Sequence, residues 1–131
     1  KKGVFVQLLE FHLEVSDLDQ SIEFYTTLLE YNRQIDFADG KASVLVMENG
    51  SAFGLWKKGK QGLFGGRGGE HVHFAFKIDP DDYDSYRRKL EDLGTEVMEH
   101  DWPNGHRSLY FFDRDGHQGE FMTTDWLNLQ D

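Results

Sequence analysis

The sequence predicts an α+β fold in which two β-α-β-β-β modules form a single domain, residues 1–131. Three observations support this fold class. Residues 8–15 and 71–78 alternate apolar and polar side chains with a period of two, which is typical of a strand with one buried face. A stretch with helical periodicity follows each strand, and three further strand-like stretches follow each helix. A chain of 131 residues can form one core or two small halves that share one.

The first module is expected to span about residues 8–58. Asp17 is a candidate N-cap for its helix, because Gln20 follows three residues later as in a capping box. Apolar residues at helical spacing predict that this helix continues to about Glu30. Three strands should follow, at about 33–38, 42–48 and 52–57, with turns at Asp39-Gly40 and Asn49-Gly50.

The second module repeats this order over about residues 71–126. Asp79-Pro80 is typical of a helix start, with an N-cap residue followed by proline at the first helical position. Gly94 stands where a glycine commonly ends a helix. Three strands are expected at about 95–100, 107–112 and 118–124, with the last hairpin turn at Asp115-Gly116.

Residues 59–70 join the two modules and contain six glycines in twelve positions. One interpretation is a flexible linker. The other is a mobile flap over a site, with Leu63 and Phe64 as its apolar tip. Glycine content alone does not distinguish these two interpretations.

The composition narrows the function classes. The net charge of −10 and the pI of about 4.9 disfavour nucleic acid and anionic membrane surfaces as partners. The chain has no cysteine, so it has no disulfide framework or thiolate nucleophile, which favours a cytoplasmic protein. No apolar run approaches the roughly 20 residues that span a bilayer. We expect a small-molecule substrate and a homodimer.

The two modules share a register of identical residues. His12 and His73 are 61 residues apart and both lie on the polar face of a first strand. The same separation relates Tyr25 to Tyr86, Leu29 to Leu90, and Glu30 to Glu91. Such a repeat predicts modules related by a pseudo-twofold axis, with His12 and His73 as symmetry mates across a cavity.

Glu120 is the third candidate for a metal site. It lies within an expected strand, after the turn at Asp115-Gly116 and directly before Phe121 and Met122. Glutamate is depleted in strands, so its presence there is unusual. A buried carboxylate needs a partner, and a cation shared with two imidazoles would provide one. Two histidines and a carboxylate leave coordination positions open for substrate, which suits Fe(II), Mn(II), Zn(II) or Ni(II).

The paired modules, the two first-strand histidines and the stretch LYFFDRDGHQGE at 109–120 resemble the vicinal oxygen chelate superfamily. This superfamily includes glyoxalase I, fosfomycin-resistance thiol transferases, extradiol dioxygenases and bleomycin-resistance proteins. The resemblance covers residues 8–126 and is closest, in ligand pattern, to the fosfomycin-resistance enzymes. It implies a divalent metal held by His12, His73 and Glu120, and it implies that Tyr110 lies near the metal and, with Glu120, takes part in catalysis.

The sequence departs from each relative in a specific way. Glyoxalase I adds a carboxylate on the last strand of its first module, and counting from the hairpin glycines places Gly54 there. The basic residues of the fosfomycin enzymes are missing from 99–104 and 125–131. In the extradiol signature Arg114 replaces a proline, and the upstream catalytic histidine has no well-spaced counterpart.

The sequence therefore favours a divalent-metal enzyme of lyase or thiol-transferase type, acting on a small substrate chelated through its oxygens. Dioxygenase chemistry with Fe(II) has less support. The alternative is a metal-free protein that binds a drug-like small molecule, as bleomycin-resistance proteins do. Among the other histidines, His71 is interpreted as a rim residue and His117 as a structural residue that caps turn backbone groups.

Overall fold

The computed structural model describes residues 8–59 and 73–125, with the side chain of Phe37 left out. Its backbone divides into two compact units, Lys1–Gly65 and Gly66–Asp131. Both units contain a four-stranded sheet and a helix, which confirms the predicted fold class. The predictions for 60–70 and for His71 lie outside the described residues.

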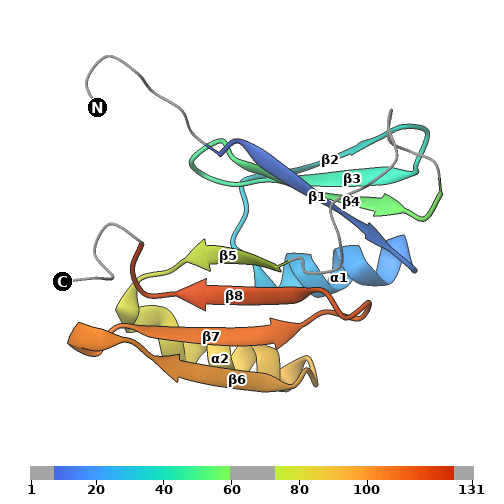
Figure 1. Ribbon diagram of the computed structural model, residues 1–131. Coiled ribbons are helices and arrows are strands. Elements are labelled where there is room, and N and C mark those ends of the chain that lie inside the picture. The colour runs from blue at the N-terminus through green and yellow to red at the C-terminus, as the bar shows by residue number, and fades with distance from the viewer. Residues whose placement is uncertain (1–7, 60–72, 126–131) are drawn as a thin grey trace, which may run out of the picture. The chain divides into compact units, whose positions relative to one another are not determined.

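The first unit is a mixed sheet covered on one face by a helix (Figure 1). Its elements are β1 (Glu10–Val15), α1 (Leu18–Leu28), β2 (Arg33–Phe37), β3 (Ala42–Val46) and β4 (Ala52–Lys57). The strand order is β1-β4-β3-β2, with β1 parallel to β4 and the other pairs antiparallel. The apolar face predicted for the first strand is buried, since Leu13 and Val15 alternate with exposed Glu14.

Asp17 caps α1 as predicted. One of its carboxylate oxygens accepts from the backbone N–H of Gln20 at 3.0 Å, and the other accepts from the Gln20 side-chain amide at 3.1 Å. In a full capping box the Gln20 side chain would bond the N-cap backbone instead. The helix ends at Leu28, two residues before the predicted end.

The second unit repeats the first. Its elements are β5 (His73–Lys77), the 3₁₀ turn η1 (Pro80–Asp82), α2 (Tyr83–Asp92), β6 (Val97–Asp101), the 3₁₀ turn η2 (Pro103–Gly105), β7 (Arg107–Phe112) and β8 (Gln118–Met122). The strand order is β5-β8-β7-β6, and β5 runs parallel to β8 (Figure 1). Asp79 caps η1 ahead of Pro80, as the sequence predicts, and Gly94 follows α2 with a φ of 79°. Neither described helix has the length and apolarity needed to cross a bilayer.

At matching positions on their helix-facing sides, the two sheets carry the larger side chain on different strands. In the first unit Leu45 pairs with Phe53, and in the second Phe111 pairs with Gly119. Both Gly119 and Phe53 lie three residues after a hairpin glycine, so these pairs are equivalent. A Cβ on Gly119 would overlap the ring of Phe111, whose side chain therefore fills the space used by Phe53 in the first unit.

Strand register corrects the predicted pairing of the histidines. His73 lies opposite Gln118, two residues after the hairpin glycine Gly116. In the first unit the matching position, two residues after the hairpin glycine Gly50, is Ala52. Ala52 lies opposite Glu10 and not opposite His12. The two first strands are thus related by an offset of 63, as in Glu10 and His73, instead of 61.

The reason for the error lies in the connection between strand and helix. The offset of 61 rested largely on identical helix residues such as Tyr25 and Tyr86. The helix residues keep an offset of 61, whereas the first strands have an offset of 63. The second unit therefore passes from strand to helix in two fewer residues, through the tight η1 turn. A constant offset cannot detect such a shortening. His12 and His73 therefore occupy non-equivalent positions on their strands.

Gly119→Ala tests this packing. The added methyl group must displace the buried Phe111 ring, so we expect a loss of about 1–3 kcal/mol in the free energy of unfolding. Urea denaturation of Gly119→Ala, Phe111→Leu and the double variant measures the coupling. The smaller leucine should relieve the overlap, so the double variant should be more stable than the sum of the single effects predicts. Strict additivity would contradict this account.

Candidate functional site

The carboxylate of Glu120 is buried on the face of the second sheet that points away from α2. Its side chain is only 5% exposed although it lies in the middle of β8. Directly opposite it on the neighbouring strands lie Ala75 of β5 and Tyr110 of β7. The methyl group of Ala75 leaves room for the carboxylate, whereas Tyr110 provides a polar group. An ionised carboxylate at such a position requires compensating donors or a cation.

Ser108 supplies one donor to Glu120. Its hydroxyl is completely buried and donates to Oε2 of Glu120 at 2.7 Å. The indole N–H of Trp102 in turn donates to the Ser108 oxygen at 2.8 Å. Because an indole is only a donor, this contact directs the serine proton toward the carboxylate. The relay from Trp102 through Ser108 thus holds one oxygen of Glu120 in place.

Tyr110 is the second polar neighbour of Glu120. Burial raises the pKa of its hydroxyl, and the charge of Glu120 together with a hydrogen bond between the two groups raises it further. A hydrogen bond with Ser108 acts in the opposite direction and is the smallest of these effects. Tyr110 therefore stays protonated near neutral pH, which keeps it available as a hydrogen-bond donor.

His73 approaches the other oxygen of Glu120. Its Nε2 lies 3.9 Å from Oε1, which is too long for a hydrogen bond. Two ligands that each lie about 2.1 Å from a shared ion are separated by roughly 3–4 Å, depending on the coordination angle. The donor chemistry and the spacing of His73 and Glu120 therefore fit a divalent cation. The structure brings these two predicted ligands together, along with the predicted catalytic residue Tyr110.

His12 lies in the first unit and has different surroundings. Its ring rests on Gly54, where an added Cβ would overlap Nδ1. Nδ1 accepts a hydrogen bond from the indole N–H of Trp56 at 2.8 Å, and Nε2 lies 3.3 Å from Oε1 of Glu10. Since an indole N–H can only donate, Nδ1 carries no proton in this arrangement.

A second group of potential ligands, Asp113, Asp115 and His117, lies in the hairpin between β7 and β8. Oδ1 of Asp113 accepts from the backbone N–H groups of Asp115 and His117, each at 2.9 Å. Its Oδ2 lies 2.7 Å from Nδ1 of His117, and this hydrogen bond raises the pKa of the imidazole. These contacts brace the turn, and the residue that caps its backbone N–H groups is Asp113, where the sequence analysis expected His117.

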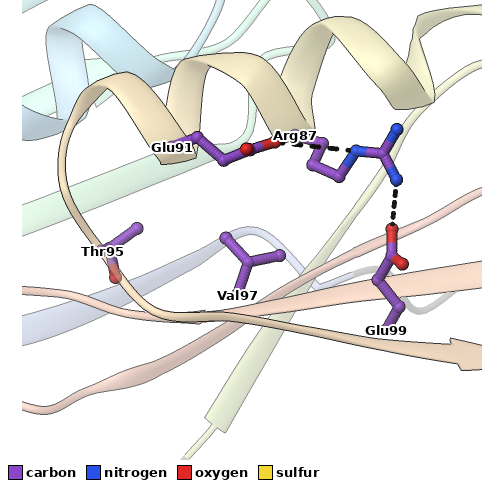
Figure 2. A pocket seen from close by; sticks show the side chains of 5 residues that line it. All are labelled: Arg87, Glu91, Thr95, Val97 and Glu99. Atoms are coloured by element: carbon purple, nitrogen blue, oxygen red, sulfur yellow. Dashed lines mark hydrogen bonds and ion pairs between the residues drawn. The ribbon is translucent and has the colours of Figure 1, made fainter.

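The opposite face of the second sheet has a hollow of about 500 Å³ between α2 and β6 (Figure 2). Arg87 lies over it and is paired with Glu99 at 2.9 Å, Asp84 at 3.2 Å and Glu91 at 3.7 Å. Three carboxylates compensate this guanidinium, so it is a poor anchor for an anionic ligand. The hollow is also on the α2 side of the sheet, away from Glu120.

Sequence reasoning did not assign Ser108, Trp102, Trp56 and Glu10 to specific contacts. Nothing in the sequence shows which acceptor the indole N–H of Trp56 or Trp102 meets. Ser108 could have been found from its spacing. It lies two residues before Tyr110 on the same strand, so it shares the face of Glu120.

The chain belongs to the Glyoxalase/Bleomycin resistance protein/Dioxygenase superfamily. The family model matches residues 7–121, which span most of both units and include every candidate residue described above. This match confirms the resemblance inferred from the paired modules and from residues 109–120.

Solved structures agree on the fold. The fosfomycin resistance protein FosX from Mesorhizobium loti has a TM-score of 0.71 and 21% identity, covering 100% of this chain and 99% of that chain. Lactoylglutathione lyase from Agrobacterium tumefaciens has a TM-score of 0.70 and 21% identity, covering 93% and 95%. A mutant FosX from Listeria monocytogenes, complexed with Mn(II) and 1S,2S-dihydroxypropylphosphonic acid, has a TM-score of 0.71 and 22% identity, covering 94% and 93%. At these identities the likeness establishes the fold.

Ser108→Ala tests the support of Glu120. The substitution removes a donor from a buried carboxylate, so we expect a loss of about 1–3 kcal/mol in the free energy of unfolding, measured by urea denaturation.

Ser43→Ala is the matched control. Ser43 is equally buried and also donates to a carboxylate, that of Asp36, at 2.8 Å, but Asp36 is exposed and keeps its hydration. Ser43→Ala should therefore cost less than Ser108→Ala. Equal costs for the two variants would show that burial of Glu120 is not what makes the contact important.

Proposed function

We propose that this protein is a divalent-metal-dependent enzyme of lyase or thiol-transferase type, with His12, His73 and Glu120 as ligands in a single domain. The observation that carries the proposal is the buried carboxylate of Glu120, held by Ser108 with its other oxygen 3.9 Å from His73. When bound, the metal would act as a Lewis acid toward substrate oxygens. The likeness to the two FosX proteins and to the lactoylglutathione lyase supports an enzyme of this general type. The FosX mutant from Listeria monocytogenes is complexed with Mn(II).

The chain's own residues have distinct tasks in this proposal. Ser108 and Trp102 hold Glu120 in one orientation, so the carboxylate does not have to reorganise when substrate arrives. Burial raises the pKa of Tyr110 above the ordinary tyrosine value, and its protonated hydroxyl would donate a hydrogen bond to a substrate oxygen that becomes negative. The carboxylate of Glu120 would also be the proton acceptor nearest to such a substrate.

The substrate class follows from the same chemistry. A site with open coordination positions and a neutral donor suits a small molecule with two adjacent oxygens. The ligand of the Listeria FosX mutant, a 1,2-dihydroxypropyl phosphonate, is such a molecule. We further propose that the protein is a cytoplasmic homodimer.

The second candidate function is metal-free binding of a drug-like small molecule. One observation favours it: both nitrogens of His12 have polar protein neighbours, Trp56 at 2.8 Å and Glu10 at 3.3 Å. In that case the polar contacts of His12 would be structural, and neither His73 nor Glu120 would affect metal content.

Elemental analysis of protein purified without chelator separates these functions. We expect a near-stoichiometric divalent metal in the unmodified chain and its loss in His73→Ala and Glu120→Gln, because each variant removes a ligand. His106→Ala, which removes a histidine that lies between η2 and β7, serves as the control. Absence of metal in the unmodified chain, together with no tight binding of added Mn(II), Ni(II), Zn(II) or Fe(II), would overturn the metalloenzyme.

A further inference from the structure

The hairpin between β3 and β4 carries an Asn-Gly pair at its tip, Asn49 and Gly50. The backbone N–H of Gly50 donates to the carbonyl of Met47 at 3.0 Å, and the N–H of Met47 donates to the carbonyl of Ser51 at 2.9 Å. Gly50 has a φ of 87°, which glycine adopts without steric cost. Both residues of the pair are exposed, so the turn presents them to water.

Ser51 fixes the side chain of Asn49. Oδ1 of Asn49 accepts from the backbone N–H of Ser51 at 3.1 Å and from its hydroxyl at 2.7 Å. Because a backbone N–H can only donate, the atom that it meets is the oxygen of the side-chain amide. The side chain thus folds back over the peptide bond to Gly50, as in an Asx turn. This arrangement brings the side-chain carbonyl carbon close to the Gly50 nitrogen, and the two donors stabilise negative charge on the carbonyl oxygen.

We propose that Asn49 is a modification site at which the chain deamidates spontaneously, with water as the co-reactant and Ser51 as the residue that promotes the reaction. The Gly50 nitrogen gives its proton to solvent and forms a bond to the side-chain carbonyl carbon of Asn49. The carbon–nitrogen bond of the side-chain amide breaks, and the leaving group takes a proton from solvent and departs as ammonia. Water then opens the cyclic imide at either carbonyl, which leaves aspartate or isoaspartate.

The hydrogen bond from Gly50 to Met47 opposes this reaction, since the Gly50 nitrogen loses its proton only when that bond opens. Hairpin tips open locally at a much lower free energy than core strands do. The contacts between Asn49 and Ser51 span only two residues, and such an opening does not require them to break. The side chain therefore stays in position for attack while the turn opens.

The equivalent turn of the second unit carries no side-chain amide. Asp115 precedes the hairpin glycine Gly116 as Asn49 precedes its own. The backbone contacts also match, because Gly116 donates to Asp113 at 3.1 Å and Asp113 donates to His117 at 3.0 Å. Deamidation to aspartate would thus give the first hairpin the residue type of the second. Isoaspartate would instead add a methylene group to the backbone of the hairpin.

Asn104 and Gly105 form another Asn-Gly pair within the described residues and provide a matched comparison. They lie in η2 and are exposed, as Asn49 and Gly50 are. Asn104 has a φ of 64° and a ψ of 24°, and no hydrogen bond with another described residue holds its side chain. The dipeptide sequence alone predicts equal rates at the two sites, whereas the contacts of Ser51 predict faster deamidation at Asn49.

Peptide mapping by tandem mass spectrometry measures both sites in one sample of the full chain kept at mildly alkaline pH. We expect aspartate and isoaspartate to accumulate at Asn49 roughly threefold to tenfold faster than at Asn104, the factor that one ordinary hydrogen bond supplies. Ser51→Ala should remove most of this difference, and Ser51→Thr, which keeps the hydroxyl, should retain it. In denaturing urea the two sites should react at similar rates.

Equal rates at Asn49 and Asn104 in the folded chain would overturn the proposal, and so would a difference that persists in urea, because it would come from the flanking sequence. Hydrogen exchange at the Gly50 amide shows whether Ser51→Ala loosens the turn. Faster exchange together with faster deamidation in Ser51→Ala would show that opening of the turn sets the rate, and it would overturn the role of Ser51. Slower deamidation with unchanged exchange would support that role.

Discussion

The buried carboxylate of Glu120 is the constraint on which the second unit depends. A carboxylate in mid-strand with 5% exposure is costly unless its oxygens are bonded. The sheet meets this requirement with polar residues at matching places: Ser108 donates to one oxygen, and Tyr110 lies directly across the strand pair. Ala75 on the other side is small enough to leave space. The remaining oxygen faces His73, and this orientation is what makes the face suitable for a cation.

The pseudo-repeat conserves volume and chemistry more closely than it conserves residue positions. On the helix side, Phe111 over Gly119 replaces the Leu45–Phe53 pair. On the other side, the ring of His12 lies over Gly54 in the first unit, whereas in the second unit Ala75 lies at the matching position opposite Glu120. Neighbouring strands in a sheet are close enough that either can fill a given space, so a side chain can change strands without changing the packed volume.

This behaviour explains what the sequence could and could not predict. Alternation in the two first strands predicts which face is buried, and Asn49-Gly50 and Asp115-Gly116 predict the hairpins, because these signals are local. The count from hairpin glycines that matched Gly54 to Glu120 agrees with the register, since the hairpins have equal geometry around their glycines. The pairing of His12 with His73 was wrong, because it carried an offset from the helices across a connection of different length. The face on which Ser108 lies follows from its spacing to Tyr110, but the hydrogen bonds of Ser108 and Trp56 depend on side-chain directions, which no spacing rule contains.

The central proposal is that His12, His73 and Glu120 bind one divalent ion. Pulsed electron paramagnetic resonance of the Mn(II)-loaded protein tests it most directly, because modulation from imidazole nitrogens counts the coordinated histidines. The account predicts the signal of two imidazoles, reduced to one in His12→Ala and in His73→Ala. A signal from one imidazole that persists unchanged in His12→Ala would confine the ion to the second module, and a signal without imidazole nitrogens would contradict the site altogether.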